Sequence, residues 1–283
     1  MTLLVGCDFS SSPTVRKPIR MAWGHLRENV VVLERMESSP SLDHFSQRLA
    51  QPCAWVGGFD MPFGLPRELV SHLNWPMTWE ACMRHYASLS RPDIRQVFSA
   101  FCEARPVGSK FAHRTCDRPA GSSPSMKWVN PPVAYMLHAG VPRLLDAGVD
   151  FPGLHCASKS DAVAADPGMR RVALEAYPGL LAREVLGRRS YKSDDKAKQT
   201  PQRLIARKDL LTALEAGQTR LSLRLKVSHA QRDALVDDAK GDAIDAVLCL
   251  MQAAWGLRQN AQGDPFFGLP ANMDPLEGWI LTA

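Results

Sequence analysis

The sequence opens with the apolar run Leu3-Leu4-Val5-Gly6-Cys7, which ends at Asp8. Such a near-continuous run is typical of a central β-strand whose two faces are both covered. The glycine at position 6 leaves room for the close approach of another backbone or of a ligand. We therefore expect a buried strand in the middle of a sheet, with the carboxylate of Asp8 at its end.

The same pattern, an apolar segment next to aspartate, occurs twice more in the chain. Asp60 ends the segment Cys53-Ala54-Trp55-Val56-Gly57-Gly58-Phe59. Asp242 and Asp245 are three residues apart at the start of an apolar helix, so their carboxylates share one helix face. Gathered in one place, these aspartates would repel one another strongly without a cation. The sequence therefore predicts a divalent-metal site at Asp8, Asp60, Asp242 and Asp245.

Each aspartate also has a purely structural explanation. Asp8 could cap the serine-rich turn that follows it, and Asp60 could form an Asx-turn before Pro62. Asp242 could be an acidic residue favoured by the dipole at a helix N-terminus. Asp245 is harder to explain in this way, because an unpaired carboxylate inside an apolar helix is unfavourable. Their occurrence together, in this order of elements, favours a common polar site.

The composition is that of a globular protein, with 45% of the 283 residues hydrophobic and 22% charged. No apolar run approaches the roughly 18 to 20 residues that a membrane helix needs. No basic segment leads into a long apolar stretch at the N-terminus, so we expect a cytoplasmic protein that does not bind membranes. The seven cysteines are an odd number spread along the chain, and we expect them to be reduced thiols.

The positive charge is concentrated in one stretch. The net charge is +5, and residues 183–226 hold twelve Lys or Arg against five Asp or Glu. Clustered cations attract polyanions, so this stretch could bind the phosphates of nucleic acid. An exposed helical hairpin with solvated charges would have the same composition. The sequence leaves both interpretations open.

The order of predicted elements indicates an α/β protein. Strands are expected at residues 3–8, 18–23 and 30–34, and their short connections favour an antiparallel meander. A helix at 41–50 leads to a strand at 53–59, which the crossover makes parallel to the first. Helical and loop residues 75–156 read as an insertion within a single domain of residues 1–283. The later elements are a strand at 170–178 with a helix to 187, a helix at 202–215 and a long helix at 242–258.

Four segments of the chain resemble an uncharacterised family described as predicted RNase H-like nucleases (domain of unknown function 429). They are Gly6-Cys7-Asp8-Phe9-Ser10, residues 58–66, Glu175-Ala176-Tyr177-Pro178 with Tyr191-Lys192, and Glu277-Gly278-Trp279-Ile280. The resemblance covers nearly the whole chain. Together with the element order, it implies an RNase H-like mixed sheet of five strands, a three-stranded meander plus parallel strands, flanked by helices.

The segment Asp242-Ala243-Ile244-Asp245-Ala246 is also similar to the last-helix acids of RuvC-type Holliday-junction resolvases. In those enzymes, two acids three residues apart complete a metal site. Their middle acid is a glutamate, whereas the matching residue here, Asp60, is one methylene shorter. The resemblance implies the same use of the helix acids, with altered geometry at position 60.

These features lead us to expect a nuclease that hydrolyses phosphodiester bonds with two Mg²⁺ or Mn²⁺ ions roughly 3.5 to 4 Å apart. Asp8 would bridge the ions, Asp60 and Asp245 would each bind one, and Asp242 or Glu175 would reach the second through water. Glu175 could instead form a salt bridge to a nearby arginine. Phosphate is expected to contact Lys192, Arg114 and Ser10.

Other readings remain open. A non-catalytic module could use the basic stretch to bind nucleic acid or a partner. A nucleotide-dependent phosphotransferase of the actin and sugar-kinase type shares the Gly-x-Asp-x-Ser opening, but its second phosphate loop and glycine-rich adenosine site are not visible. Trp128 or Tyr135 could stack on bases or pack in the core. A zinc site could be formed by Cys82, His85, His113 and Cys116. The sequence does not indicate an oligomeric state.

Overall fold

The first three strands form the antiparallel meander that their short connections predict. The computed structural model describes residues 2–157 and 170–283. In it, β1 (Leu3–Asp8) pairs with β2 (Ile19–Arg27), which pairs with β3 (Val30–Ser39), both antiparallel. The second and third strands are longer than expected, so the meander is the largest part of the sheet.

The parallel half of the sheet begins after the meander. Helix α1 (Leu42–Leu49) starts at Ser41, whose hydroxyl accepts a hydrogen bond of 3.1 Å from the backbone of His44. The helix crosses over to β4 (Trp55–Phe59), which lies parallel to β1 as predicted. Strand β5 (Arg171–Glu175) then pairs in parallel with β4.

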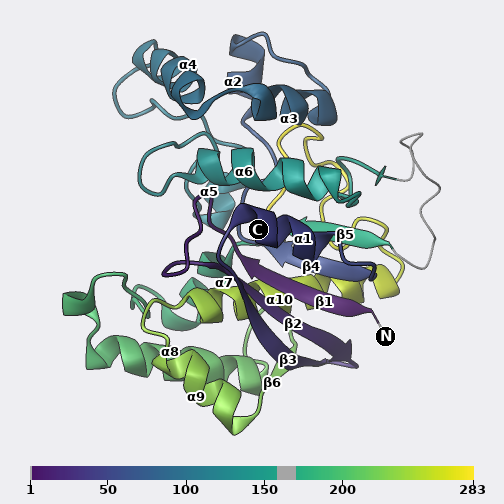
Figure 1. The fold of residues 1–283 in the computed structure, drawn as a ribbon, viewed down its shortest axis with the longest axis vertical. Helices are drawn as coiled ribbons and strands as arrows, with labels where there is room; N and C mark the ends of the chain where they lie inside the picture. Colours follow the sequence, from purple (N-terminus) through teal and green to yellow (C-terminus); the bar gives the residue numbers. More distant parts are fainter. Residues whose placement is uncertain (1, 158–169) are drawn as a thin grey trace.

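The prediction of five strands is wrong, because six strands are present in the described residues. Strand β6 (Arg224–Lys226) pairs in parallel with β3, and the full order is β5-β4-β1-β2-β3-β6. With three residues and only Leu225 buried, β6 is too short to show a period of two in the sequence. The α/β class is confirmed, as a mixed sheet flanked by helices (Figure 1).

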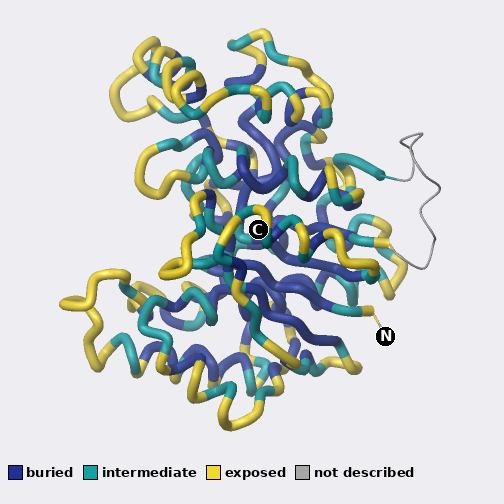
Figure 2. Tube along the Cα trace, viewed as in Figure 1, coloured by how far each residue is buried: buried dark blue, intermediate teal, exposed yellow. Residues whose placement is uncertain are grey.

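The sheet separates two hydrophobic clusters. Val5 and Cys7 of β1 contribute to one cluster, which α1 and the insertion cover, while Leu4 contributes to the other. This alternation follows from the period of two along a strand. Figure 2 shows the result, with buried residues along the strands and exposed ones on the outer helices and loops.

The insertion is helical, and it shares a core with the sheet. Buried Trp79, Tyr86 and Phe98 belong to the same cluster as Val5 and Phe59 of the sheet. The helices of this region are α2 (Arg67–His72), just before the insertion, then α3 (Trp79–Ser88), α4 (Arg91–Glu103), α5 (Asp117–Ala120) and α6 (Val133–Asp146).

Helix α10 (Asp242–Ala261) lies directly on the sheet, across β1, β2 and β4. Glycines allow this contact: a Cβ atom at Gly6 would overlap the backbone of Ala246, and one at Gly58 would overlap that of Cys249. The same face carries α7 (Pro178–Leu186), the 3-10 helix η3 (Lys196–Lys198), α8 (Pro201–Ala216) and α9 (His229–Asp237).

Two features bear on the environment of the chain. Among the described residues, no helix is both long and apolar enough to cross a membrane. Cys7, Cys82, Cys102, Cys116 and Cys249 are buried free thiols. Trp279, in the segment after α10, is partly buried against the second cluster.

Candidate active site

Asp8 and Asp60 come together because β1 and β4 are parallel neighbours. The register pairs Cys7 with Phe59, so the next residue of each strand is an aspartate at the same end of the sheet. The backbone N–H of Asp60 donates a 2.9 Å hydrogen bond to the carbonyl of Cys7. The chain therefore presents two carboxylates side by side, as the sequence predicted from the ends of the two apolar runs.

The first turn of α10 supplies the other two aspartates. Gly241, the residue before the helix, has a φ of 78°, and a Cβ atom there would press on the side chain of Lys192. Asp245 is fully buried, whereas Asp242 is half-buried. Because α10 rests on β1, its first turn lies near the end of the strand that carries Asp8.

Asp245 already has two partners. The hydroxyl of Tyr191 donates a hydrogen bond to one carboxylate oxygen, and the ammonium group of Lys192 forms an ion pair with the other. The buried Arg207 supports this segment by donating to the carbonyls of Tyr191, at 2.8 Å, and of Val236, at 2.6 Å. The segment that carries Tyr191 and Lys192 is thus fixed next to the first turn of α10.

The other three aspartates have raised pKa values. Burial raises the pKa of Asp8 well above its ordinary value, the charges of Asp245 and Asp60 raise it further, and Lys192 opposes the change. Burial, followed by the charge of Asp245, raises the pKa of Asp60 to about 7. Burial also raises the pKa of Asp242. The cluster therefore resists full ionisation on its own.

The donor chemistry of the cluster suits a hard divalent cation. No protein donor is hydrogen-bonded to the carboxylates of Asp8, Asp60 or Asp242 in the described parts of the chain, and carboxylate oxygens are the ligands that Mg²⁺ and Mn²⁺ prefer. The ligand set is nevertheless incomplete as it stands. Within residues 2–157 and 170–283, no three His, Cys, Asp or Glu side chains are arranged to hold a metal ion. The carboxylate of Asp245 forms an ion pair with Lys192 instead.

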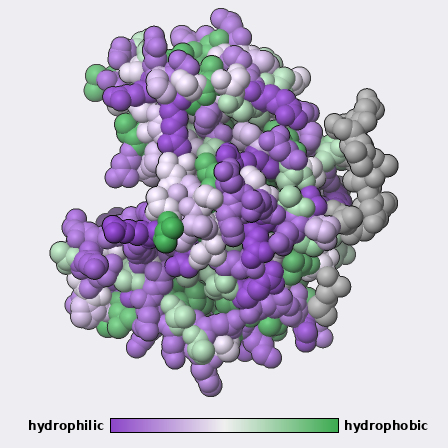
Figure 3. Space-filling model, viewed as in Figure 1, coloured by the Kyte–Doolittle hydropathy of each residue, from purple (hydrophilic) through white to green (hydrophobic). Residues whose placement is uncertain are grey.

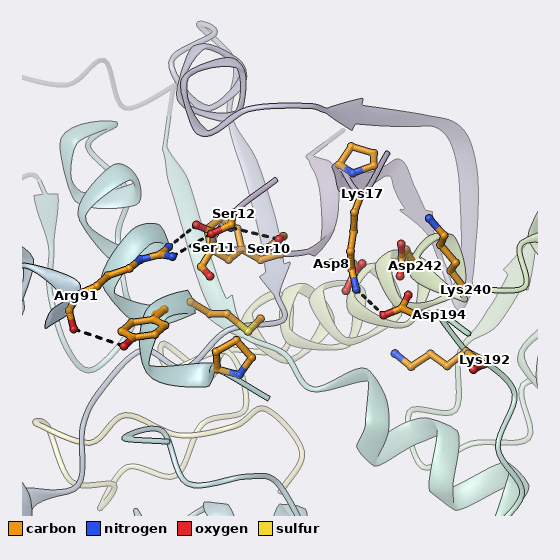
Figure 4. Close-up of a pocket in the computed structure, with 16 residues that line it drawn as sticks. Asp8, Ser10, Ser11, Ser12, Lys17, Arg91, Lys192, Asp194, Lys240 and Asp242 are labelled. Carbon is orange, nitrogen blue, oxygen red and sulfur yellow. Dashed lines mark hydrogen bonds and ion pairs between the residues drawn. The ribbon is translucent and has the colours of Figure 1, made fainter. Parts of the chain in front are cut away.

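A cavity of about 570 Å³ opens beside the cluster. Figure 4 shows Asp8 and Asp242 near one end of it, with Lys17, Lys192 and Lys240 around them. Ser10, one of the predicted phosphate contacts, also lines this cavity. In the space-filling view, the outline of the molecule is notched between the insertion and the helices below the sheet, and hydrophilic residues surround the notch (Figure 3).

Two of the cavity lysines have partners of their own. Lys17 forms a 2.8 Å ion pair with Asp194, and Lys240 donates a 3.0 Å hydrogen bond to the carbonyl of Arg16. Lys192 also lines a second, smaller cavity of about 260 Å³, and Asp60 lies on that side. Lys192 therefore lines both the cavity next to Asp8 and the cavity next to Asp60.

Glu175 and Arg114 take a different role from the one expected. The guanidinium of Arg114 donates to both carboxylate oxygens of Glu175, at 2.6 and 2.7 Å, and to Asp117 at 2.9 Å. All three side chains are at most 3% exposed. The carboxylate of Glu175 also accepts a 2.9 Å hydrogen bond from the backbone of Phe63. This is the salt bridge that the sequence left as an alternative for Glu175, and we leave both residues out of the proposed site.

The structure adds residues that sequence patterns did not assign. Lys17 and Lys240 line the cavity next to Asp8, and Arg91 lines its far end. No motif marks them, because they come from a loop, a helix connection and the start of α4. Tyr191 was part of the family resemblance, but its contact with Asp245 spans 54 residues and has no local signal.

The insertion also contains the residues suggested for a zinc site and for stacking on bases. In the described chain, no metal-binding group forms from Cys82, His85, His113 and Cys116. Cys82 lies in the large core cluster, whereas Cys116 packs with Ala120 and Ile280. Trp128 packs against Phe98 and Phe111, while Tyr135 lines the cavity.

Several cations of the basic stretch have partners within the protein. Arg189 forms a 2.6 Å ion pair with Asp209, Arg220 forms one of 2.8 Å with Glu184, and Arg207 is buried. Arg183 donates to the hydroxyl of Tyr177 at 3.2 Å. From this stretch, Lys192 lines both cavities of the candidate site, and Arg183 and Arg189 line the one next to Asp60.

One comparison with known proteins gives a match. A family model described as protein of unknown function (DUF429) matches residues 27–264, most of the chain. The matched region includes Asp60, Asp242 and Asp245, while Asp8 precedes it. No curated protein and no solved structure matches the chain.

Proposed function

The chain belongs to the DUF429 family of proteins of unknown function, and we propose that this member is a metal-dependent nuclease that hydrolyses phosphodiester bonds in nucleic acid. One observation carries the proposal. Asp8 and Asp60 end adjacent parallel strands next to the aspartates of α10, each lines a cavity that Lys192 also lines, and no protein donor is hydrogen-bonded to either carboxylate in the described residues. Such a cluster needs a cation, and its surroundings attract an anion.

An RNase H-like architecture is part of the same proposal. The meander β1-β2-β3, the parallel strands β4 and β5 beside β1, and the closing helix α10 support it. Strand β6 adds to the outer edge of β3, with three strands between it and β4, so it leaves the carboxylate end of β1 and β4 unchanged.

Each residue would have a definite task. Asp8, Asp60 and Asp242 would hold Mg²⁺ or Mn²⁺, which when bound supplies an activated water and neutralises charge on the leaving oxygen. Lys192 would pair with the phosphate of the substrate, and the carboxylate of Asp245 would then become available as a further ligand. Lys17 and Lys240 would attract the polyanion to the cavity, and Ser10 would donate to a phosphate oxygen. We propose the reducing cytoplasm as the location, since Cys7, Cys82, Cys102, Cys116 and Cys249 are buried thiols.

One observation favours a second candidate, a non-catalytic module that binds nucleic acid. The ion pair between Lys192 and Asp245 satisfies the only fully buried aspartate of the cluster without any metal. Such a module would bind nucleic acid and leave it intact. The phosphotransferase alternative requires a second domain, and the described residues form a single sheet.

A cleavage panel tests the proposal. Single-stranded, duplex, RNA–DNA hybrid and four-way substrates are incubated with Mg²⁺, Mn²⁺ or EDTA, using the wild type and the double variant Asp8→Asn with Asp245→Asn. We expect metal-dependent cleavage that the double variant loses. Asp233→Asn, an exposed aspartate of α9, is the matched control. Cleavage that persists in EDTA would contradict the proposal, and metal-insensitive binding without cleavage would favour the second candidate.

A further inference from the structure

A second hollow runs along α4 and joins the candidate active site. Its volume is about 650 Å³, and Arg91, Arg95, Gln96, Ser99 and Tyr135 are among its lining residues. Arg91 and Tyr135 also line the cavity that contains Asp8 and Asp242. The two hollows therefore lie next to each other and share this pair of side chains, and we call them together the path.

Arg91 is held in place at the junction. Its guanidinium donates to the carbonyl of Ser11 at 2.7 Å and to the hydroxyl of Ser12 at 3.0 Å, and it lies 4.9 Å from the centre of the Tyr135 ring. Figure 4 shows these contacts between Arg91 and the serine loop. Two of its five N–H donors are used in this way, which leaves three for a ligand.

The hollow along α4 has a net positive charge, with two arginines and one glutamate among its lining residues. Within residues 2–157 and 170–283, neither Arg91 nor the exposed Arg95 forms an ion pair with an acidic side chain. The hollow also contains the carboxylate of Glu103, which accepts a 3.1 Å hydrogen bond from the hydroxyl of Ser99. An anionic ligand on this path would therefore meet two arginines and one acid, with the arginines free of ion pairs.

From this geometry we infer that the path binds single-stranded nucleic acid, with a base on the ring of Tyr135 and the flanking phosphates on Arg91 and Arg95. Tyr135 is half-buried and lines both hollows. The guanidinium of Arg91 lies over one face of its ring, so a base would stack on the other face. Base faces are covered in a duplex, so stacking selects an unpaired nucleotide. The inference rests on the proposed nuclease, for which it names the class of substrate.

The test is direct binding in EDTA, where no cleavage occurs. Fluorescence anisotropy is measured with a labelled single-stranded oligonucleotide, the same sequence as a duplex, and polyglutamate as an acidic protein segment. We expect tight binding only of the single strand. Tyr135→Leu should weaken that binding about fivefold or more, and Tyr135→Trp should retain it, since stacking depends on the aromatic face. Arg91→Gln should also weaken it and reduce its salt dependence by about one phosphate contact.

Controls keep the result interpretable. Arg27→Gln, an exposed arginine at the opposite end of the strands from Asp8, should bind as the wild type does. Circular dichroism and thermal melting confirm that each variant folds, and the Tyr135→Trp comparison remains if Tyr135→Leu does not. Equal binding of duplex or polyglutamate, or no difference between Tyr135→Leu and the wild type, would overturn the inference. A wild type that shows this binding but no metal-dependent cleavage would refute only the proposed nuclease activity.

Discussion

The ammonium group of Lys192 forms an ion pair with the fully buried carboxylate of Asp245, at the place where four aspartates converge. Burial alone would lower the pKa of Lys192, but the charges of Asp245, Asp8 and Asp60 outweigh it and raise that pKa. The lysine is therefore a permanent cation within a cluster that requires positive charge. A divalent ion that used all four aspartates would have to displace it.

The variant Lys192→Met removes this internal cation at nearly constant length. We expect its affinity for Mn²⁺ to rise about tenfold, equivalent to about 1.4 kcal/mol, because the ion no longer competes with an ammonium group for Asp245. Isothermal titration calorimetry measures the affinity. Without metal, the melting temperature should fall, since Asp245 is left buried with only Tyr191 as a partner. Lys196→Met, an exposed lysine, serves as the control. An unchanged or weaker affinity would mean that Asp245 is not a metal ligand.

Asp8→Asn should abolish catalysis while leaving the fold intact. The amide keeps the shape of the side chain but removes the charge that the neighbouring aspartates repel. We expect metal-dependent cleavage to fall more than about a hundredfold. In EDTA at pH 8, the melting temperature should equal or exceed that of the wild type. A variant that melts much lower would indicate that Asp8 serves the fold, as a turn cap would.

The stabilisation by metal should depend on pH. The pKa of Asp60 is about 7 in the folded protein, compared with 3.8 for an ordinary aspartate, so the folded state binds more protons than the unfolded state between these values. Without metal, this group makes the protein less stable as the pH rises from about 4 to about 7. A cation binds the ionised form, so Mn²⁺ should raise the melting temperature more at pH 8 than at pH 5. Equal shifts at both values, or the same dependence in Asp60→Asn, would exclude this residue as the origin.

Arg114→Met separates a structural role from a substrate contact. The substitution leaves Glu175 and Asp117 buried without their cation, so we expect the free energy of unfolding in urea to fall by about 3–5 kcal/mol. Arg84→Met, which removes an exposed pair with Glu80, should change it by less than about 1 kcal/mol. Cleavage per folded molecule should be unchanged. If Arg114→Met does not fold, Glu175→Gln provides the milder comparison. A loss of cleavage at full stability would return Arg114 to the substrate site.

The parts of this protein that could be predicted are those with a local signal. Apolar runs that end in aspartate predicted β1 and β4, and their parallel pairing then placed Asp8 beside Asp60. The apolar helix with acids three residues apart predicted the start of α10. In both cases a few consecutive residues contain the whole pattern, so one sequence is sufficient.

The parts that could not be predicted depend on contacts between distant residues. The Lys192–Asp245 pair spans 53 residues, and nothing near Lys192 distinguishes a partner of Asp245 from a phosphate ligand. Glu175 was a weaker metal candidate with a salt bridge to an arginine as its alternative, and only the fold, which buries Arg114 against it, decides between them. Strand β6 has one buried residue, so its place depends on β3 rather than on its own composition.

The glycines under α10 determine which part of the site can evolve. Because the helix touches the backbones of β1 and β4 directly, with no side chain in between at Gly6 and Gly58, the spacing between strand-borne and helix-borne acids is set by the radii of main-chain atoms. Substitutions that change the size of core residues would therefore not change that spacing. Adaptation to an ion of another radius would have to act through the loop segment that carries Tyr191 and Lys192.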